Sequence, residues 1–332
     1  VEFRDPTQET VTGRFRVVDN DHMQLSDQFG NEYVLQRVSG ADATQPAPVG
    51  GGFQPAPTVA SPPVTGEGAK PTSVALRPQP EPKEGAFTIL VPQGWTLTGG
   101  VVRVNPDAAG GPMQSIETKF DLTMQSDPRG LVMIRWLPHV YFADMRGSQT
   151  EGLFPPGSNY AGMPVAPQMP PQQFALQVVL PQLRPGAQNA QIVEQADLPE
   201  LANGFARETQ IVMARVPGGE ALGFRYQAGS VTVDYDEGGV RFREVVLSVM
   251  EYRAPVPVAV WCNKFTIAAR APQAHFDRWA GIARLIFSRI QWNREWVRKE
   301  LVAQLQRTST VQATLDELAR LVRLRHAQLL DD

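Results

Sequence analysis

The alternation of apolar and polar positions begins near the start of the chain. Residues 1 to 40 alternate in three short runs, at Thr10 to Val18, His22 to Leu25 and Glu32 to Val38, with turn residues between the runs. Such alternation predicts β-strands joined by tight turns. We expect a small three-stranded β meander, which at this length and with no cysteine would need another surface to stabilise it.

The pattern then stops abruptly. Residues 41 to 85 show no hydrophobic period and contain ten prolines. This composition is typical of a linker or arm that favours the polyproline II conformation. Such an arm is long enough to reach a neighbouring subunit. A second proline-rich stretch covers residues 147 to 173, and a loop of that length inside a domain is usually functional or mobile.

Residues 86 to 290 carry the main alternation and predict one larger domain. We expect six or more strands, mostly antiparallel because the turns between them are short. The apolar spacing from Gln273 to Ile290 predicts a helix that packs on the sheet, and a helical turn is expected near Leu198 to Asn203. The expected strands are Phe87 to Pro92, Thr96 to Val104, Ile116 to Met124, Leu131 to Met145, Phe205 to Val216, Ala221 to Tyr226, Ser230 to Asp236, Val240 to Tyr252 and Val258 to Ile267.

Residues 291 to 332 predict a C-terminal helical extension. Apolar positions recur at alternating steps of three and four residues, as in a coiled coil. Ser309 and Gln312 have the spacing of a capping box, so the extension is either one long helix or two. Packing back on the main domain and forming a partner interface both fit. The apolar positions are Val297, Leu301, Leu305, Val311, Leu315, Leu318, Val322 and Leu329.

The main domain resembles a known superfamily. Its opening, Phe87-x-Ile89-x-Val91-Pro92-x-Gly94-Trp95, is followed by antiparallel strands and by a closing amphipathic helix that ends near Ser288-Arg289-Ile290. Over residues 86 to 290 this is similar to the PsbP/Mog1/DcrB-like superfamily. The resemblance implies an α+β fold, an αβα sandwich on a mainly antiparallel sheet. The N-terminal arm, the loop at 147 to 173 and the C-terminal extension are additions to that fold.

The superfamily resemblance also implies a class of function. Its members mostly bind partners: extrinsic photosystem subunits, a nuclear transport factor, secretion chaperones and many exported bacterial proteins. They share no catalytic motif that transfers to positions in this chain. By that analogy the chain is expected to be a non-catalytic binding protein.

Charge and cysteine content narrow the classes of partner. The formal net charge is −3, which gives no positive field to attract nucleic acid. The single cysteine, Cys262, excludes an internal disulfide and a cysteine-rich metal cluster. The longest strongly apolar stretches, Leu131 to Leu137 and Val256 to Trp261, are too short to cross a bilayer. We expect no transmembrane segment and no nucleic-acid partner.

No residue set predicts catalysis, metal binding or a cofactor. The four histidines, at positions 22, 139, 275 and 326, are widely separated, and His139 fits a strand end. Cys262 lies in a β-prone apolar run and is expected to be buried. The arginines at 241, 243 and 253 alternate with Glu244 and Glu251, a pattern that predicts cross-strand pairs on a solvated face.

The expected function is therefore non-catalytic protein binding or structural assembly, with a protein partner or a second copy, and with export to the periplasm or exterior as the expected location. Two alternatives stay open: a small-ligand binder or hydrolase with a pocket under the 147 to 173 loop, and a chaperone-like peptide binder. The candidate partner-binding residues are the aromatic and apolar side chains of the second proline-rich stretch and the C-terminal extension: Phe154, Tyr160, Met163, Met169, Trp292, Trp296, Leu315 and Val322.

Overall fold

The computed structural model describes residues 14–17, 22–26, 32–36, 74–148, 151–214, 223–253, 258–309 and 311. The chain divides into two compact units. Unit 1 comprises residues 1–78 and 90–94, and unit 2 comprises residues 79–89 and 95–332. Within these described ranges no helix is both long and apolar enough to span a bilayer.

Unit 1 contains a three-stranded antiparallel sheet in the order β1-β2-β3. Three strands thus occur where the N-terminal alternation predicts them. Their bounds are β1 (Arg14–Val17), β2 (His22–Ser26) and β3 (Glu32–Gln36). Of the arm expected at residues 41 to 85, residues 41 to 73 lie outside the described residues.

Unit 2 is built on an eight-stranded, mainly antiparallel sheet in the order β12-β13-β14-β15-β8-β7-β6, with β9 pairing to β15 beside β8. The α+β class is therefore confirmed. The strands are β6 (Thr96–Val102), β7 (Lys119–Gln125), β8 (Met133–Leu137), β9 (Tyr141–Asp144), β12 (Gln188–Asp197), β13 (Arg225–Glu237), β14 (Val240–Arg253) and β15 (Ala259–Pro272).

The described chain also contains two smaller sheets and three short 3-10 helices. One sheet has the order β16-β5-β4, and the other joins β10 to β11 inside the second proline-rich stretch. The strands are β4 (Leu76–Pro80), β5 (Phe87–Pro92), β10 (Asn159–Tyr160), β11 (Met163–Pro164) and β16 (Gln291–Trp292); the short helices are η2 (Met113–Ser115), η3 (Glu151–Leu153) and η6 (Gln273–His275).

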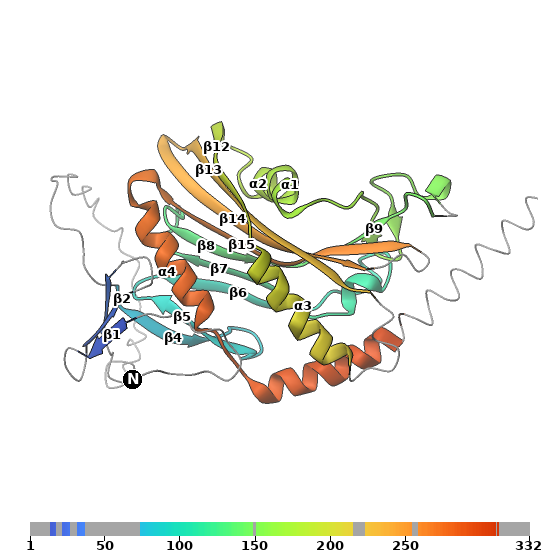
Figure 1. Cartoon of the computed structure of the whole chain (residues 1–332), viewed down its shortest axis with the longest axis horizontal. Coiled ribbons are helices and arrows are strands. Elements are labelled where there is room, and N and C mark those ends of the chain that lie inside the picture. Colours follow the sequence, from blue (N-terminus) through green and yellow to red (C-terminus); the bar gives the residue numbers. More distant parts are fainter. Residues whose placement is uncertain are drawn as a thin grey trace, which may run out of the picture. The chain divides into compact units, whose positions relative to one another are not determined.

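Helices cover both faces of the large sheet, as Figure 1 shows. On one face lies a continuous helical segment made of α1 (Pro171–Phe174), the π-helix η4 (Ala175–Val179) and α2 (Leu180–Leu183). Its Phe174 and Val179 pack in one core cluster with Val231 and Val233 of β13. This cluster forms the part of the core that lies between the helical segment and the sheet.

The opposite face is covered by α3 (Pro199–Met213) and α4 (Phe276–Ser288). Ala202 of α3 packs with Val249 of β14, and Phe276 of α4 packs with Ala271 of β15. The predicted sheet-packing helix from Gln273 to Ile290 is confirmed by α4. The three layers give the αβα arrangement that the resemblance implied.

Two expectations for this region were wrong. The segment Phe205 to Val216, expected to be a strand, belongs to the helix α3 as far as Met213. Helical spacing of Leu201, Ala202 and Phe205 against β13 decides its conformation, because those side chains lie on one face. The strand β12 was not expected, since its residues are mostly polar and exposed on both faces.

One outer strand of the large sheet, β6, is blocked along part of its free edge, and the other, β12, pairs irregularly with β13. On β6, the buried carboxylate of Glu81 accepts the backbone N–H of Val101 at 2.7 Å, and those of Lys83, Glu84 and Ala86 at 3.0, 2.7 and 3.4 Å. On β12, two register shifts interrupt the ladder. Bulges and caps of this kind hinder strand addition, so the sheet edges give little support to peptide capture.

Candidate functional site

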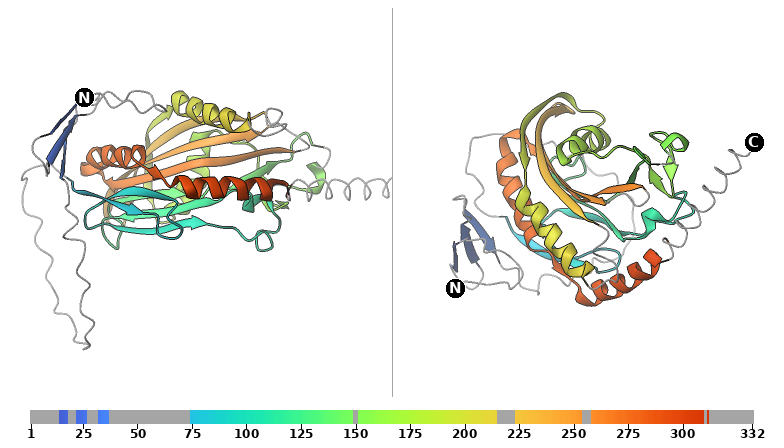
Figure 2. Two further views of the ribbon diagram at one scale, coloured as in Figure 1. Left: turned by 90° about the horizontal axis from the view of Figure 1, so that it is seen from below. Right: turned by 45° about the vertical axis from the view of Figure 1, so that its right-hand side comes forward.

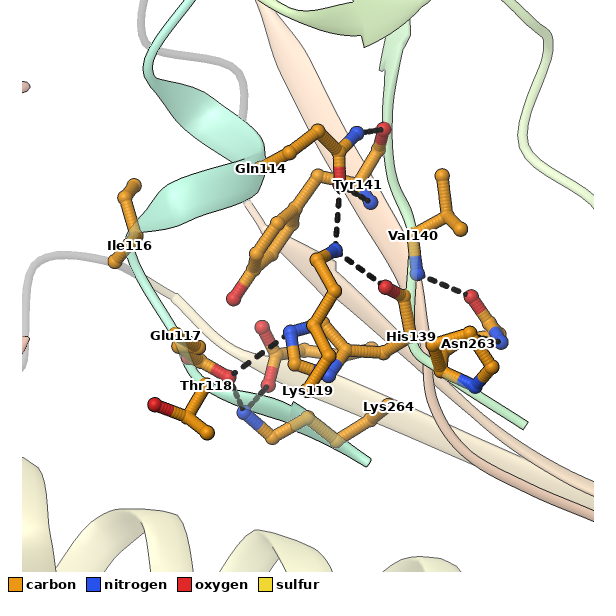
Figure 3. Close-up of polar contacts among 12 residues, drawn as sticks. Gln114, Ile116, Glu117, Thr118, Lys119, His139, Val140, Tyr141, Asn263 and Lys264 are labelled. Atoms are coloured by element: carbon orange, nitrogen blue, oxygen red, sulfur yellow. Dashed lines mark hydrogen bonds and ion pairs between the residues drawn. The ribbon is translucent and has the colours of Figure 1, made fainter. Parts of the chain in front are cut away.

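One concentration of buried and partly buried charge in unit 2 lies at the end of the sheet where β7, β9, β14 and β15 meet. We call it the charge cluster; it consists of Glu117, Lys119, His139, Glu251, Arg253 and Lys264. Figure 3 shows four of these side chains, Glu117, Lys119, His139 and Lys264, lying close together. Glu117 lies in the loop between η2 and β7, and His139 lies between β8 and β9.

Glu117 is the centre of the charge cluster. Its Oε2 lies 2.5 Å from Nζ of Lys264 and 3.7 Å from Nε2 of His139, and its Oε1 lies 3.7 Å from Nη2 of Arg253. Burial alone would raise the pKa of this carboxyl, but the neighbouring cations, Lys264 foremost, hold the pKa far below its usual range. Glu117 is therefore ionised at neutral pH.

The second carboxylate, Glu251, links the cluster to helix α3. Its side chain is 2% exposed and its Oε1 lies 2.8 Å from Nη2 of Arg253. The hydroxyl of Tyr226 donates to Oε2 of Glu251 at 2.7 Å and forms a 2.7 Å hydrogen bond with Thr209 of α3. The expectation of solvated cross-strand pairs is wrong for Glu251, and also for Glu244, which is fully buried against Arg184.

The remaining members of the cluster have shifted pKa values. Burial lowers the pKa of His139 to about 3, so the ring is neutral at pH 7, and its Nε2 has no hydrogen-bond partner within the described chain. Burial also lowers the pKa of Lys119 to about 8. The Nζ of Lys119 donates to Oε1 of Gln114 at 2.7 Å and to the carbonyl oxygen of His139 at 2.5 Å.

Residues 294–309 form a helix, here called the C-terminal helix. Asn293 caps it, because its Oδ1 accepts the N–H of Glu295 at 3.1 Å and of Trp296 at 3.2 Å. Ser309 belongs to this helix and its hydroxyl donates to the carbonyl oxygen of Gln306 at 2.8 Å. Gln312, its expected partner in a capping box, lies outside the described residues, so one helix or two stays a prediction. The positions beyond Val311, including the candidates Leu315 and Val322, lie outside the described residues.

The loop of residues 116 to 118 joins the charge cluster to the C-terminal helix. The Nε of Arg307 donates to the carbonyl oxygen of Ile116 at 2.8 Å, and the hydroxyl of Thr118 donates to Oε1 of Glu300 at 2.5 Å. Glu117, between these two residues, points into the cluster. The helix is therefore fastened to unit 2 through its polar side.

The other side of the C-terminal helix faces solvent and carries three large aliphatic side chains among exposed polar ones. Leu301, Val302 and Leu305 are 43%, 52% and 55% exposed. An ordinary surface helix turns such residues towards the core and its charges outward. This helix departs from that pattern in part, because Glu300 and Arg307 occupy its inner side while the three aliphatic side chains face solvent. We call Leu301, Val302 and Leu305 the outward face.

The structure places the other candidate partner-binding residues in two environments. In the second proline-rich stretch, Tyr160 and Met163 are buried in the chain's own core, with Phe154 packed against them and Met169 against the neighbouring cluster. Trp292 is 45% exposed at the edge of an aromatic group with Phe87, Phe120 and Trp136. Trp296 is half-buried and donates from Nε1 to Glu84 at 2.8 Å. Their role in partner binding stays a prediction.

The described residues offer little that resembles an enzyme site. One groove, of about 520 Å³, lies between the α1–η4 segment and β12 and is open to solvent. Its lining contains a single carboxylate, that of Asp197, among glutamines, Leu176 and Pro170. Within the described ranges no group of histidine, cysteine or carboxylate side chains is arranged to hold a metal ion. Cys262 is fully buried, and burial raises the pKa of its thiol.

Sequence reasoning did not identify the charge cluster. Its members are spread from position 117 to position 264 and only the strand pairing brings them together. The one local signal was the sequence Glu117-Thr118-Lys119, in which two charged residues flank a polar one at the start of an expected strand.

Comparison with solved structures gives a structural likeness to a known protein. The chain is similar to the solution structure of the cyanobacterial PsbP protein (CyanoP) of Synechocystis sp. PCC 6803, with 9% sequence identity and a TM-score of 0.24, over 66% of this chain and 92% of that one. A likeness at this TM-score carries no argument about fold or function, and membership in the superfamily stays a prediction. No family model and no curated protein matches the chain.

Proposed function

We propose that this chain is a non-catalytic protein-binding or assembly protein and that the C-terminal helix presents its binding surface. The observation that carries the proposal is the outward face, where three large aliphatic side chains of one helix are about half exposed. Burying one such side chain on a partner contributes on the order of 1 to 2 kcal/mol. The face is therefore a plausible anchor for a protein partner.

The attachment of the helix supports the same proposal. The hydrogen bonds of Arg307 and Glu300 to the 116 to 118 loop fix which side of the helix faces solvent. A helix held in this way loses little conformational freedom when a partner binds. The charge cluster beneath the loop then serves as a rigid support for the binding surface, not as a reactive centre. The proposal also includes export from the cytoplasm, which is expected from the sequence.

The proposal is tested by comparing proteins that co-purify with the full chain and with the variant Leu301→Ser/Leu305→Ser, quantified against a common standard. We expect at least one specific partner, or the chain itself, to be depleted about tenfold or more from the variant. Leu153→Ser is the matched control, because Leu153 is 59% exposed and lies on η3. Equal recovery from all three proteins would count against the C-terminal helix as the binding surface.

A further inference from the structure

Two helices of unit 2 carry the same pattern of exposed residues with opposite charge. On the C-terminal helix, Arg298 precedes Leu301 by three residues and Val302 by four. On α3, Glu208 precedes Ile211 by three and Val212 by four. Residues spaced three and four apart lie on one side of a helix. Each helix therefore presents a charge beside an aliphatic pair.

The aliphatic side chains of both patterns are exposed to solvent among the described residues. Ile211 is 60% exposed and Val212 is 41% exposed, comparable with the outward face of the C-terminal helix. Glu208 and Arg298 are exposed, and neither forms an ion pair or hydrogen bond with another described residue. Within the described residues each aliphatic pair thus lacks an apolar cover, and neither charge has an ion-pair partner, since Glu295, the carboxylate near Arg298, pairs with Lys299.

The two patterns also lie at the same end of unit 2. Figure 1 and the right-hand view of Figure 2 both place the C-terminal end of α3 and the C-terminal helix at the lower side of the unit. The charge cluster holds both helices, through Thr209 and Tyr226 for α3 and through Ile116 for the C-terminal helix. Their side chains are therefore presented from fixed positions.

We propose that two copies of this chain associate by packing α3 of one copy against the C-terminal helix of the other, with Glu208 beside Arg298 and the aliphatic pairs in contact. This rests on the proposed function and names its partner as a second copy. A two-fold axis repeats the contact and covers the exposed aliphatic side chains of both helices in each copy. In such a dimer the exposed aliphatic side chains of both helices are covered by the second copy, without a different protein.

The charges give the contact its specificity. The aliphatic side chains supply most of the affinity, whereas the carboxylate and the guanidinium fix which helix meets which. Two C-terminal helices packed on each other would bring Arg298 of the two copies together, and two α3 helices would do the same with Glu208. Like charges in contact disfavour both of those arrangements.

The test is sedimentation velocity of the full chain at about 100 µM and at about 1 µM. We expect the wild-type protein to associate at the higher concentration. Arg298→Glu alone and Glu208→Arg alone are each expected to weaken association about tenfold or more, and the double variant Arg298→Glu/Glu208→Arg to restore it. Ile211→Ser weakens the contact without a change of charge. Glu194→Arg, at an exposed position of β12, is the matched charge control and should leave association unchanged.

Three outcomes would overturn the inference: a wild-type protein that is monomeric at both concentrations, association that neither single charge reversal weakens, or single reversals that weaken association without rescue by the double variant. The proposed function fails separately. If the chain is monomeric but Leu301→Ser/Leu305→Ser still loses a co-purifying protein, the C-terminal helix binds a different partner and only the second-copy inference is wrong. Thermal unfolding of each variant confirms that it is folded.

Discussion

Arg307 on the C-terminal helix donates a hydrogen bond from its Nε to the backbone carbonyl oxygen of Ile116, at 2.8 Å. The two residues are 191 positions apart in the sequence, and the bond joins the helix to the loop that supplies the central carboxylate of the charge cluster. The same guanidinium also contacts the carboxylate of Glu300 on its own helix. This pairing turns Glu300 and Arg307 inward and leaves Leu301, Val302 and Leu305 to solvent.

Removing that guanidinium should release the helix. In Arg307→Ala, the Ile116 carbonyl loses its partner and Glu300 loses one cation, a change worth about 1 to 3 kcal/mol. Hydrogen exchange at the amides of residues 300 to 309 should become faster, while the amides of β14 keep their wild-type rates. Lys299→Ala is the control, since its ion pair with Glu295 is largely exposed. Unchanged exchange in Arg307→Ala would show that other contacts hold the helix.

The ion pair between Glu117 and Lys264 should be strongly coupled. Glu117→Gln leaves Lys264 and Arg253 facing a neutral side chain in a buried site, and should lower the free energy of unfolding by about 3 kcal/mol or more. The double variant Glu117→Gln/Lys264→Met removes one charge of each sign and should be less destabilised than the sum of the two single changes. Urea denaturation of the four proteins measures this, and additive effects would contradict the pairing.

His139 should make stability depend on pH between about 3 and 6.5. Its pKa in the folded chain is lowered to about 3, whereas in the unfolded chain the usual value of about 6.5 applies. In that range the unfolded chain binds more protons, so stability is fully present above pH 6.5 and is lost as the pH falls. The expected loss from this group between pH 7 and pH 5 is about 2 kcal/mol.

Substitution of His139 isolates that contribution. His139→Gln should flatten the dependence of the unfolding free energy on pH between 5 and 7, whatever its effect on stability at pH 7. His275→Gln, at an exposed position on η6, should keep the wild-type slope. The measurement is denaturant unfolding at several pH values. An identical slope in the wild type and in His139→Gln would mean that the histidine has the same pKa in the folded and unfolded chain, which would contradict its burial as a neutral ring.

Glu81 should protect the free edge of β6. Its carboxylate accepts four backbone N–H groups, including that of Val101. Glu81→Ala should expose these donors, lower the unfolding free energy by at least about 2 kcal/mol and speed hydrogen exchange at Val101. Gly100→Ala should act in the same direction, because a Cβ there would lie 2.1 Å from Oε1 of Glu81. Wild-type exchange at Val101 in both variants would contradict this role.

The sequence pattern predicted the parts of the fold whose side chains alternate between core and solvent. The strand β14 and the helix α4 follow directly from period-two and helical spacing. The helix α3 did not, because Ile211 and Val212 lie on its exposed end and suggested a strand in which they would be buried. The strand β12 had no apolar pattern at all, since backbone pairing with β13 forms it at the edge of the sheet.

The candidate site could be predicted only in part. The apolar positions of the C-terminal helix were identified, but their direction was not, because it depends on the hydrogen bonds of Arg307 and Glu300 to a distant loop. The charge cluster was missed because Lys119, Glu251 and Lys264 become neighbours only through the pairing of non-adjacent strands. Apart from the run Glu117-Thr118-Lys119, nothing in the local sequence distinguishes these residues from solvated surface charges.

The central claim is that the outward face of the C-terminal helix binds protein. The most direct test is photo-cross-linking in cells that produce the full chain, with a photoreactive amino acid at position 305 in one variant and at position 153 in another. The account predicts a discrete cross-linked product from position 305, of the chain with itself or with one other protein, and none from position 153. No product from position 305, or the same products from both positions, would contradict it.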